Sequence, residues 1–310
     1  MAQAIDSALA QTYPNIEILI INDGSDDGGE SESIALSYGS RIKYYRKENG
    51  GVSSALNYAF TKMCGEWFSW LSHDDLYLPD KILRQVEYLN KLTETHPEID
   101  ITKITVRTVT KSIDKNSKTI KVPFYGDVPE IEEPLDTILN NVFNYRLSGC
   151  SFLLPRSCVS DVGGFREDIR TVSDVEYWYR LLFFGYRFHC LKNERLVLNR
   201  SHGKQVGKTK VQLFTSELND LFINIADRLA ADKLAAEKKY IEYRYFEKYY
   251  MALVKRNCKP AYKYVKMNYL KNNAGFIRYY VIIPIRASFY KISGFLRNIA
   301  RTVYRKINVK

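Results

Sequence analysis

The sequence predicts an α/β fold with an open, doubly wound and mostly parallel sheet, followed by a helical, basic C-terminal extension. Short apolar runs alternate with helical patterns through the first two thirds of the chain, as in folds built from strand–helix–strand units. Acidic residues follow directly after two of the predicted strands, at Asp23-Gly24 and at Asp74-Asp75. In open α/β sheets, ligands bind at the carboxyl ends of strands, so we expect these residues to converge on one crevice.

The N-terminal part divides into elements at its turn residues and at changes of apolar period. An apolar run between Pro14-Asn15 and Asp23-Gly24 predicts a buried strand, and a second apolar run delivers Asp74 and Asp75. The predicted elements are, in order, a strand over 16–21, a helix over 31–38, a strand over 42–45, a helix over 52–63, a strand over 67–71 and an amphipathic helix over 80–92.

The following part is less regular. Residues 101–119 are β-branched and polar with little helical period, and residues 122–134 are acidic and contain proline, so we expect an irregular region there. Gly185 ends the last helix of this part, as glycine often does. The elements predicted after the irregular region are a helix over 135–143, a strand over 150–154, a short helix over 156–162 and a helix over 174–184.

Length and composition predict a globular protein. The chain has 310 residues, of which 45% are apolar, enough for one large domain and an extension. No window reaches the roughly 18 consecutive apolar residues that span a bilayer, and no secretory signal opens the chain. The five cysteines never occur at Cys-x-x-Cys spacing. We therefore expect a reducing, cytoplasmic location.

The net charge of +11 is concentrated at the C-terminal end. Residues 248–310 contain 15 Lys or Arg and no acid, so residues 1–247 carry a net charge of −4. From Phe289 onward, apolar residues fall on one arc of a helix and basic residues lie opposite. Such a basic amphipathic helix fits an anionic membrane surface. The alternative is a helix packed on the rest of the protein, with its basic side in water.

Several motifs occur in a fixed order, although each alone is weak, because Asp-Gly runs are ordinary turns and paired aspartates are usually solvated. Together they resemble the family 2 inverting glycosyltransferases with the GT-A nucleotide-sugar fold, from about residue 4 to residue 208. The segments that carry the resemblance are the helix and strand over 4–21 with Asn22-Asp23-Gly24-Ser25, then Glu48-Asn49-Gly50-Gly51, Leu71-Ser72-His73-Asp74-Asp75, Gly163-Gly164-Phe165, residues 174–180 and Arg200-Ser201-His202.

The resemblance implies a donor site at the carboxyl ends of the first strands. Asp23 would hold the imide edge of a uracil, and Gly24 would let the backbone approach the ligand closely. Asn49 and Gly50 would complete the nucleotide-binding turn, and Asp74 would face the ribose. Family members often carry Arg where this chain has Leu56, which removes one expected contact to the base or phosphate.

The resemblance also implies a divalent cation, Mg²⁺ or Mn²⁺, held by Asp75 and by His202 in the late loop. Carboxylate oxygens suit these hard cations, which bind through one or two protein groups plus phosphates. We expect the His73 side chain to point into the sheet or the solvent rather than to bind the cation. Arg200, with Lys204 and Lys208, would add positive charge against the diphosphate.

An inverting transfer needs one base opposite the leaving group, and we assign this role to Asp174. It stands at the start of the helix over 174–184, where the backbone N–H groups stabilise an ionised carboxylate, and it matches the aspartate of the family's Glu-Asp motif. Ser173 replaces the glutamate of that motif and would cap the helix. Glu176 is interpreted as a paired or exposed helix acid, and Trp178 as a core residue.

The predicted organisation is a nucleotide-sugar glycosyltransferase domain over 1–208, a helical connector over 209–247 and the basic tail over 248–310. Family members begin with an apolar strand that precedes the helix at Met1. Its absence here leaves two interpretations: a start downstream of the true one, or a truncated and inactive copy.

The predicted function is transfer of a sugar from a UDP-sugar to a glycan or lipid-linked acceptor in surface polysaccharide synthesis, on the inner face of the cell membrane. The alternatives are an inactive remnant of the fold and a nucleic-acid-binding protein that uses the basic tail. No recognition motif accompanies the charge of that tail, so no nucleic acid is expected as a partner.

Overall fold

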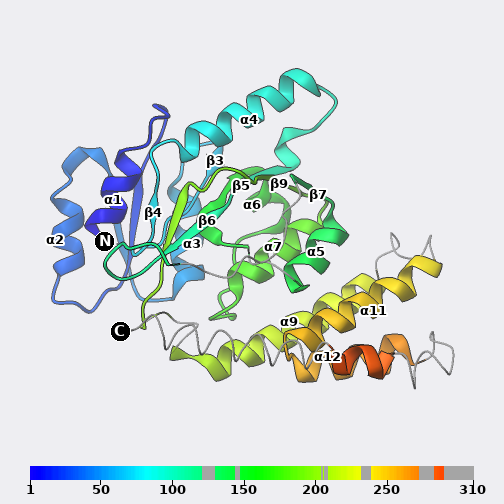
Figure 1. Ribbon diagram of the computed structural model, residues 1–310. Helices are drawn as coiled ribbons and strands as arrows, with labels where there is room; N and C mark the ends of the chain where they lie inside the picture. The colour runs from blue at the N-terminus through cyan, green and yellow to red at the C-terminus, as the bar shows by residue number, and fades with distance from the viewer. Residues whose placement is uncertain are drawn as a thin grey trace. The chain divides into compact units, whose positions relative to one another are not determined.

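The computed structural model divides the chain into two units (Figure 1). The first comprises Met1–Thr137 and Leu147–Val211, and the second comprises Ile138–Arg146 and Gln212–Lys310. The chain thus leaves the first unit near residue 211, whereas the sequence places a division at residue 208. The described residues are 1–120, 130–143, 147–203, 205, 209–231, 239–271 and 283–289.

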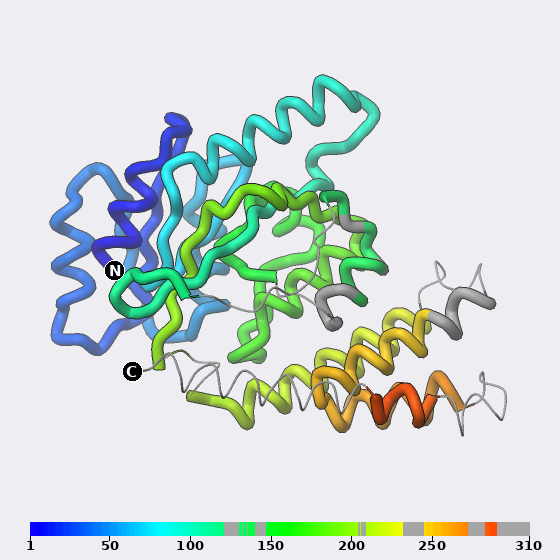
Figure 2. Tube along the Cα trace, viewed as in Figure 1, coloured from blue at the N-terminus to red at the C-terminus, as the bar shows by residue number. Residues whose placement is uncertain are grey.

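The first unit contains the predicted alternation of strands and helices, which can be followed along the trace in Figure 2. Each predicted helix is present, with ends that differ by a few residues from the sequence pattern. The helices are α1 (Ala2–Leu9), α2 (Glu30–Leu36), α3 (Val52–Lys62), α4 (Lys81–Thr95), α5 (Pro134–Phe143), α6 (Ser157–Val162) and α7 (Ser173–Phe183); α5 continues into the second unit.

Strands β1 (Leu19–Asp23) and β2 (Lys43–Lys47) form a parallel pair, with Leu19 opposite Lys43 and Asp23 opposite Lys47. An apolar cluster that includes Ile5 holds α1 and α2 against this pair. Since β2 borders β1 on one side, the other edge of β1 pairs with no strand among the described residues. The pair places Asp23 beside the loop that enters α3.

The largest sheet has five strands in the order β3-β8-β5-β9-β7. Strands β5 and β9 are parallel, whereas β8 runs antiparallel to both of its neighbours and β7 antiparallel to β9. This sheet is thus mixed, because β8 runs opposite to β3 and β5, which flank it. The bounds are β3 (Trp67–Phe68), β8 (Phe152–Pro155), β5 (Ile104–Thr108), β9 (Arg187–Leu191) and β7 (Ile131–Glu132).

A third sheet connects the loop that carries Asp74 and Asp75 to the late part of the chain. Its strands are β4 (Leu76–Tyr77), β10 (Val197–Arg200) and β6 (Thr110–Ile113), with β10 in the middle. Strand β10 is antiparallel to β4 and parallel to β6. This arrangement brings the residues that follow Val197 next to Asp74 and Asp75.

The expectation of an irregular region over 101–119 is wrong. Strand β5 lies in the centre of the largest sheet with all five of its residues buried, and β6 follows after one residue. Residues 104–108 read ITVRT, an alternation of apolar and polar residues that is itself a strand signal, although both faces of the strand are buried. The strand was missed because the polar residues of this segment, such as Arg107, were given more weight than their alternation with apolar residues.

The core of the first unit lies between α4 and the largest sheet, and under α7. Apolar residues of α4 pack on β5 and β8 in one cluster with Ile104 and Leu153. Aromatic rings fill the space below α7, where Trp178 is fully buried and stacks on Phe152 at 4.3 Å between ring centres. The assignment of Trp178 to the core is confirmed.

The second unit is helical where it is described. Helices α9 (Val211–Ala231) and α11 (Lys239–Lys255) are joined by a hydrogen bond from the Tyr249 hydroxyl to the Phe222 carbonyl. Helix α12 (Lys259–Val265) packs on α11, and a π-helical turn follows it over Lys266–Leu270. None of the described helices is long and apolar enough to cross a membrane. The predicted basic amphipathic helix lies, from residue 290 on, outside the described residues.

Candidate active site

Asp23 ends β1, where its carboxylate binds the loop that leads into α3. Oδ1 accepts hydrogen bonds from the Lys47 ammonium at 2.8 Å and the Gly50 amide at 3.0 Å, and Oδ2 accepts one from the Gly51 amide at 2.6 Å. Burial opposes ionisation, but the bonds from Lys47 and the two amides lower the pKa of Asp23. Oδ2 retains a lone pair for one further donor.

Gly24 packs tightly against the same loop. Its φ of +64° and its position leave no room for a side chain, because a Cβ atom would lie 2.7 Å from the Asn49 amide nitrogen. The four residues expected to bind the donor nucleotide at this edge therefore lie together: Asp23, Gly24, Asn49 and Gly50. Their role in donor binding stays a prediction.

Asp74 and His202 form the second group of predicted site residues. His202 Nε2 lies 2.7 Å from Asp74 Oδ2, and both side chains are partly exposed. The structure thus brings His202 to Asp74, whereas the sequence pairs His202 with Asp75 as a metal ligand. His73 is exposed, which is the simpler of the interpretations that the sequence allows.

Asp75 points into the protein. Its Oδ1 accepts a hydrogen bond from the Arg200 amide at 2.7 Å, and its Oδ2 accepts bonds from Asn199 Nδ2 at 2.8 Å and from the Cys150 thiol at 3.3 Å. The side chain is buried, and burial raises the pKa of Asp75. These contacts fix the loop that carries Asp74.

The sequence analysis did not identify Cys150 and Asn199 as supports of this loop. They lie far along the chain from Asp75, and only the fold brings β8 and β10 beside it. A local signal exists for Asn199 alone, because it directly precedes the motif Arg200-Ser201-His202.

The Arg200 guanidinium is held by several hydrogen bonds, so it stabilises the structure of this region. Its Nε donates to the Asp74 carbonyl at 2.8 Å, and its Nη2 donates to Gln3 Oε1 at 3.0 Å. Its Nη1 donates to the turn over 114–117. The other two cations that the sequence assigns to this place, Lys204 and Lys208, lie outside the described residues.

Asp174 lies in the first turn of α7, as predicted. Its Oδ1 accepts a hydrogen bond from the Val175 amide at 2.8 Å, but burial dominates and raises the pKa of Asp174 to about 6. A carboxylate with this pKa is ionised at neutral pH and is still a better proton acceptor than an ordinary aspartate. Helix α7 begins at Ser173, which does not cap it: Val172 is the N-cap residue and makes no side-chain cap bond.

Helix α7 is held in place by a charge pair. Glu176 and Arg180 form two hydrogen bonds, at 2.8 and 3.0 Å, and Arg180 also donates to the carbonyls of Val162 and Gly164. The interpretation of Glu176 as a paired helix acid is confirmed. Because this pair ties α7 to the turn that precedes it, it also fixes where Asp174 stands.

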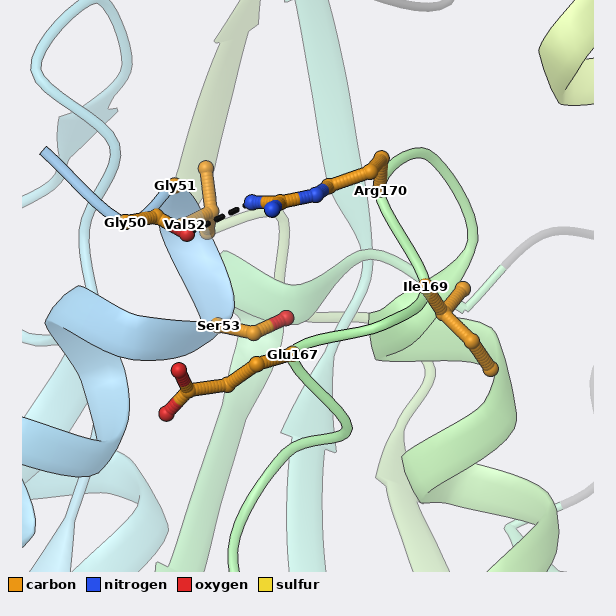
Figure 3. Close-up of a pocket in the computed structure, with 7 residues that line it drawn as sticks. All are labelled: Gly50, Gly51, Val52, Ser53, Glu167, Ile169 and Arg170. Atoms are coloured by element: carbon orange, nitrogen blue, oxygen red, sulfur yellow. Dashed lines mark hydrogen bonds between the residues drawn. The ribbon is translucent and has the colours of Figure 1, made fainter.

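A small, open pocket lies between the start of α3 and the loop before α7 (Figure 3). Arg170 reaches across it, and its Nη1 donates to the Gly50 carbonyl at 2.7 Å. Asn57 anchors the same loop, since it exchanges hydrogen bonds with the Phe165 backbone. The remaining lining residues are Gly51, Val52, Ser53, Glu167 and Ile169.

The predicted site residues thus form a group around Asp23, a pair of Asp74 with His202, and Asp174 on α7. Among the described residues, no cluster of three or more His, Cys, Asp or Glu side chains is arranged to hold a metal ion. Mg²⁺ and Mn²⁺ also bind through only one or two protein groups when phosphates complete the shell. The pair of Asp74 and His202 fits a cation of that kind.

The model of the family described as Glycosyl transferase family 2 matches residues 1–125 of the chain. A glycosyltransferase of Rickettsia prowazekii is 39% identical over 229 residues, which are 74% of this chain and 68% of that protein. One of Rickettsia felis is 40% identical over the same number of residues, but the chain spans only 36% of its length. Both relatives are described as uncharacterized.

Among solved structures, the chain is similar to residues 1–349 of Staphylococcus aureus TarS in complex with UDP-GlcNAc. The TM-score is 0.59 at 13% sequence identity, and the match covers 94% of this chain and 84% of that one. At this identity the likeness concerns the fold alone. It confirms the α/β fold of the GT-A type that the sequence predicts.

Proposed function

Because the chain belongs to glycosyl transferase family 2, we propose that it moves a hexose or N-acetylhexosamine from a UDP-sugar to a glycan or lipid-linked acceptor. We further propose that the anomeric carbon is inverted and that the product enters a bacterial surface polysaccharide. The UDP-GlcNAc complex of the similarly folded TarS supports a nucleotide-sugar donor.

The observation that carries this proposal is Asp174. Inversion in a single displacement requires a base that removes the proton of the acceptor hydroxyl as that oxygen attacks. The Asp174 carboxylate has its pKa raised to about 6 by burial and stands in the first turn of α7. It would accept that proton while the nucleoside diphosphate leaves on the opposite side of the sugar.

The donor would be held at the carboxyl end of β1. Asp23 is already fixed by Lys47 and two loop amides, and its remaining lone pair would accept the imide N–H of uracil. The preorganised loop spares the protein the entropy of ordering these groups when the nucleotide binds. Gly24 keeps Asn49 and Gly50 close to this carboxylate.

For the cation, Mg²⁺ or Mn²⁺, we propose Asp74 and His202 as the protein ligands. A bound cation would neutralise charge that develops on the leaving diphosphate. Asp75, the ligand expected from the sequence, has both carboxylate oxygens engaged by protein donors, so we give it the role of fixing the Asp74 loop.

We also propose a cytoplasmic location at the inner face of the cell membrane. The support for it is the charge of residues 248–310, which carry 15 basic residues and no acid. Each basic residue near an anionic surface contributes on the order of 1 kcal/mol. The acceptor would then be met at the membrane surface.

The proposed function is tested by a screen of nucleotide sugars for divalent-dependent release of UDP, with UDP affinity measured by calorimetry. We expect release from one or a few UDP-sugars and its loss in Asp174→Asn, while UDP still binds. A chain that binds no UDP with or without divalent cations would be the inactive form of the fold.

A further inference from the structure

The pocket between α3 and the loop before α7 gathers hydrogen-bond donors at its α3 side. Helix α3 begins at Val52, and its N-cap residue Gly51 supplies no side-chain cap. The Gly50 and Gly51 amides are used by Asp23, but the structure describes no partner for the Val52 and Ser53 amides that follow. The start of an 11-residue helix thus offers N–H groups and the positive end of its dipole.

Ser53 adds an independent sign that this place binds a ligand. Its side chain lines the pocket and points into it in Figure 3. The residue is 4% exposed, yet its hydroxyl makes no hydrogen bond within the described part of the chain. The hydroxyl can therefore donate a hydrogen bond to a ligand in the pocket.

Arg170 brings a positive charge to the same end of α3. Its guanidinium lies over Gly51, where a Cβ atom would be 3.0 Å from Nη1, and the φ of +87° at Gly51 favours glycine. A cation is unfavourable at a helix N-terminus, because the dipole is positive there. An anion placed beside Arg170 at the start of the helix would be attracted by both.

Glu167 also lines the pocket, but its carboxylate is turned toward α3. Oε1 accepts a hydrogen bond from Asn57 Nδ2 at 2.9 Å, and in Figure 3 the side chain points away from Arg170. The negative charge therefore lies on the side of the pocket that is remote from the guanidinium.

We propose that this pocket binds a phosphate-type oxyanion, with the Val52 and Ser53 amides and the Ser53 hydroxyl as donors and Arg170 as the counter-charge. The inference rests on the proposed function, because the oxyanion would belong to a substrate. Two sources share this chemistry: the diphosphate of the donor, and a phosphate group carried by the acceptor.

The test measures binding of inorganic phosphate to the full chain by calorimetry and through the Val52 and Ser53 amide resonances. We expect Arg170→Gln to weaken phosphate binding about tenfold, the scale of one charge-assisted contact. Ser53→Ala should weaken it less. The matched control is Arg166→Gln, because Arg166 lies in the same loop but pairs with Asp168 and does not line the pocket.

Repeating the phosphate-binding measurement with UDP-saturated protein distinguishes the donor diphosphate from a phosphate group of the acceptor. If UDP displaces inorganic phosphate, the pocket takes the donor diphosphate. If phosphate still binds and still depends on Arg170, the pocket takes a phosphate group of the acceptor. Equal phosphate affinity in wild type, Arg170→Gln and Arg166→Gln, or no shift of the two amides, would overturn the inference. In that case retained UDP binding would leave the proposed function intact.

Discussion

At the scale of single residues, Asp174 determines the pH dependence that we expect of the reaction. Its pKa of about 6 means that the base is protonated in acid, so kcat should rise with pH through about 6 and then level off. Asp174→Asn should lower kcat by roughly 10²–10⁴-fold with UDP affinity nearly unchanged. Steady-state kinetics from pH 5 to 8 provide the measurement, with Asp168→Asn as a surface control.

Stability provides a second readout for the same substitution. The pKa of Asp174 is higher in the folded chain than its ordinary value of 3.8, so the folded state binds this proton more tightly than the unfolded state. That contribution to stability is complete below pH 3.8 and is lost as pH rises through about 6. Asp174→Asn should therefore be at least as stable as the wild type at pH 8. A large loss of Tm with normal kcat would show a structural role instead.

The neighbouring carboxylates Asp74 and Asp75 should respond differently to the same change. Asp74→Asn should abolish divalent-dependent UDP binding with little effect on unfolding, because Asp74 contacts the partly exposed His202. Asp75→Asn should lower the free energy of unfolding by about 1–3 kcal/mol, since an amide NH₂ would face the donors that the carboxylate now accepts.

Calorimetry with and without Mn²⁺, together with urea unfolding, separates these two cases. Asp75→Asn could instead keep normal stability and lose divalent-dependent UDP binding, while Asp74→Asn keeps both. That result would assign the cation to Asp75, as the sequence does.

At the scale of elements, a fully buried lysine joins α4 to the sheet. Lys81 lies in the first turn of α4, and its Nζ donates to Ser69 Oγ and to the Phe152 carbonyl and lies 4.3 Å from the centre of the Tyr77 ring. Burial lowers the pKa of Lys81 to about 7. Lys81 thereby contacts Ser69 and Tyr77, which flank the loop that carries Asp74.

This lysine should make stability depend on pH. Between pH 7 and 10.5 the unfolded chain binds the Lys81 proton while the folded chain releases it, so stability rises with pH, by at most about 1.4 kcal/mol per unit from this group. In Lys81→Met, the free energy of unfolding should rise less steeply with pH, because the contribution of Lys81 is absent. Urea unfolding of wild type and Lys81→Met at pH 7, 8 and 9 measures both free energies of unfolding. The contributions of all other titrating groups cancel in the difference between the two proteins. Equal slopes would mean that Lys81 stays protonated in the fold.

At the scale of the whole molecule, charge should determine where the protein resides. The C-terminal residues 290–310 contain six basic residues and no acid. We expect their removal to reduce binding to phosphatidylglycerol vesicles sharply, and salt to weaken binding of the full chain, because the Debye length falls from about 10 Å at 0.1 M to about 3 Å at 1 M. Vesicle co-sedimentation measures both effects.

The truncation is placed after residue 289 for a structural reason. Arg286 pairs with the buried Glu247 at 2.6 Å, and a shorter chain would leave that carboxylate without its partner. Release of UDP with a soluble acceptor should survive in the truncated protein. Unchanged vesicle binding, or binding to oligonucleotides in preference to vesicles, would contradict the membrane proposal.

The sequence by itself determined the family, most helices and the candidate residues, because these depend on local signals. Period, turn residues and the order of short motifs predict α3, α4 and α7 and point to Asp23, Asp74 and Asp174. The strand β5 was missed although its residues alternate between apolar and polar, because the burial of its polar side chains depends on packing that no local pattern encodes.

Only the tertiary structure decided what each side chain contacts. Hydrogen bonds between residues that are far apart in sequence depend on strand order, which no local pattern encodes. The sheet β4-β10-β6 brings His202 to Asp74 and Asn199 to Asp75, and so separates a partly exposed carboxylate from a buried one. Burial, which raises the pKa of Asp174 and lowers that of Lys81, is likewise a property of the packed molecule.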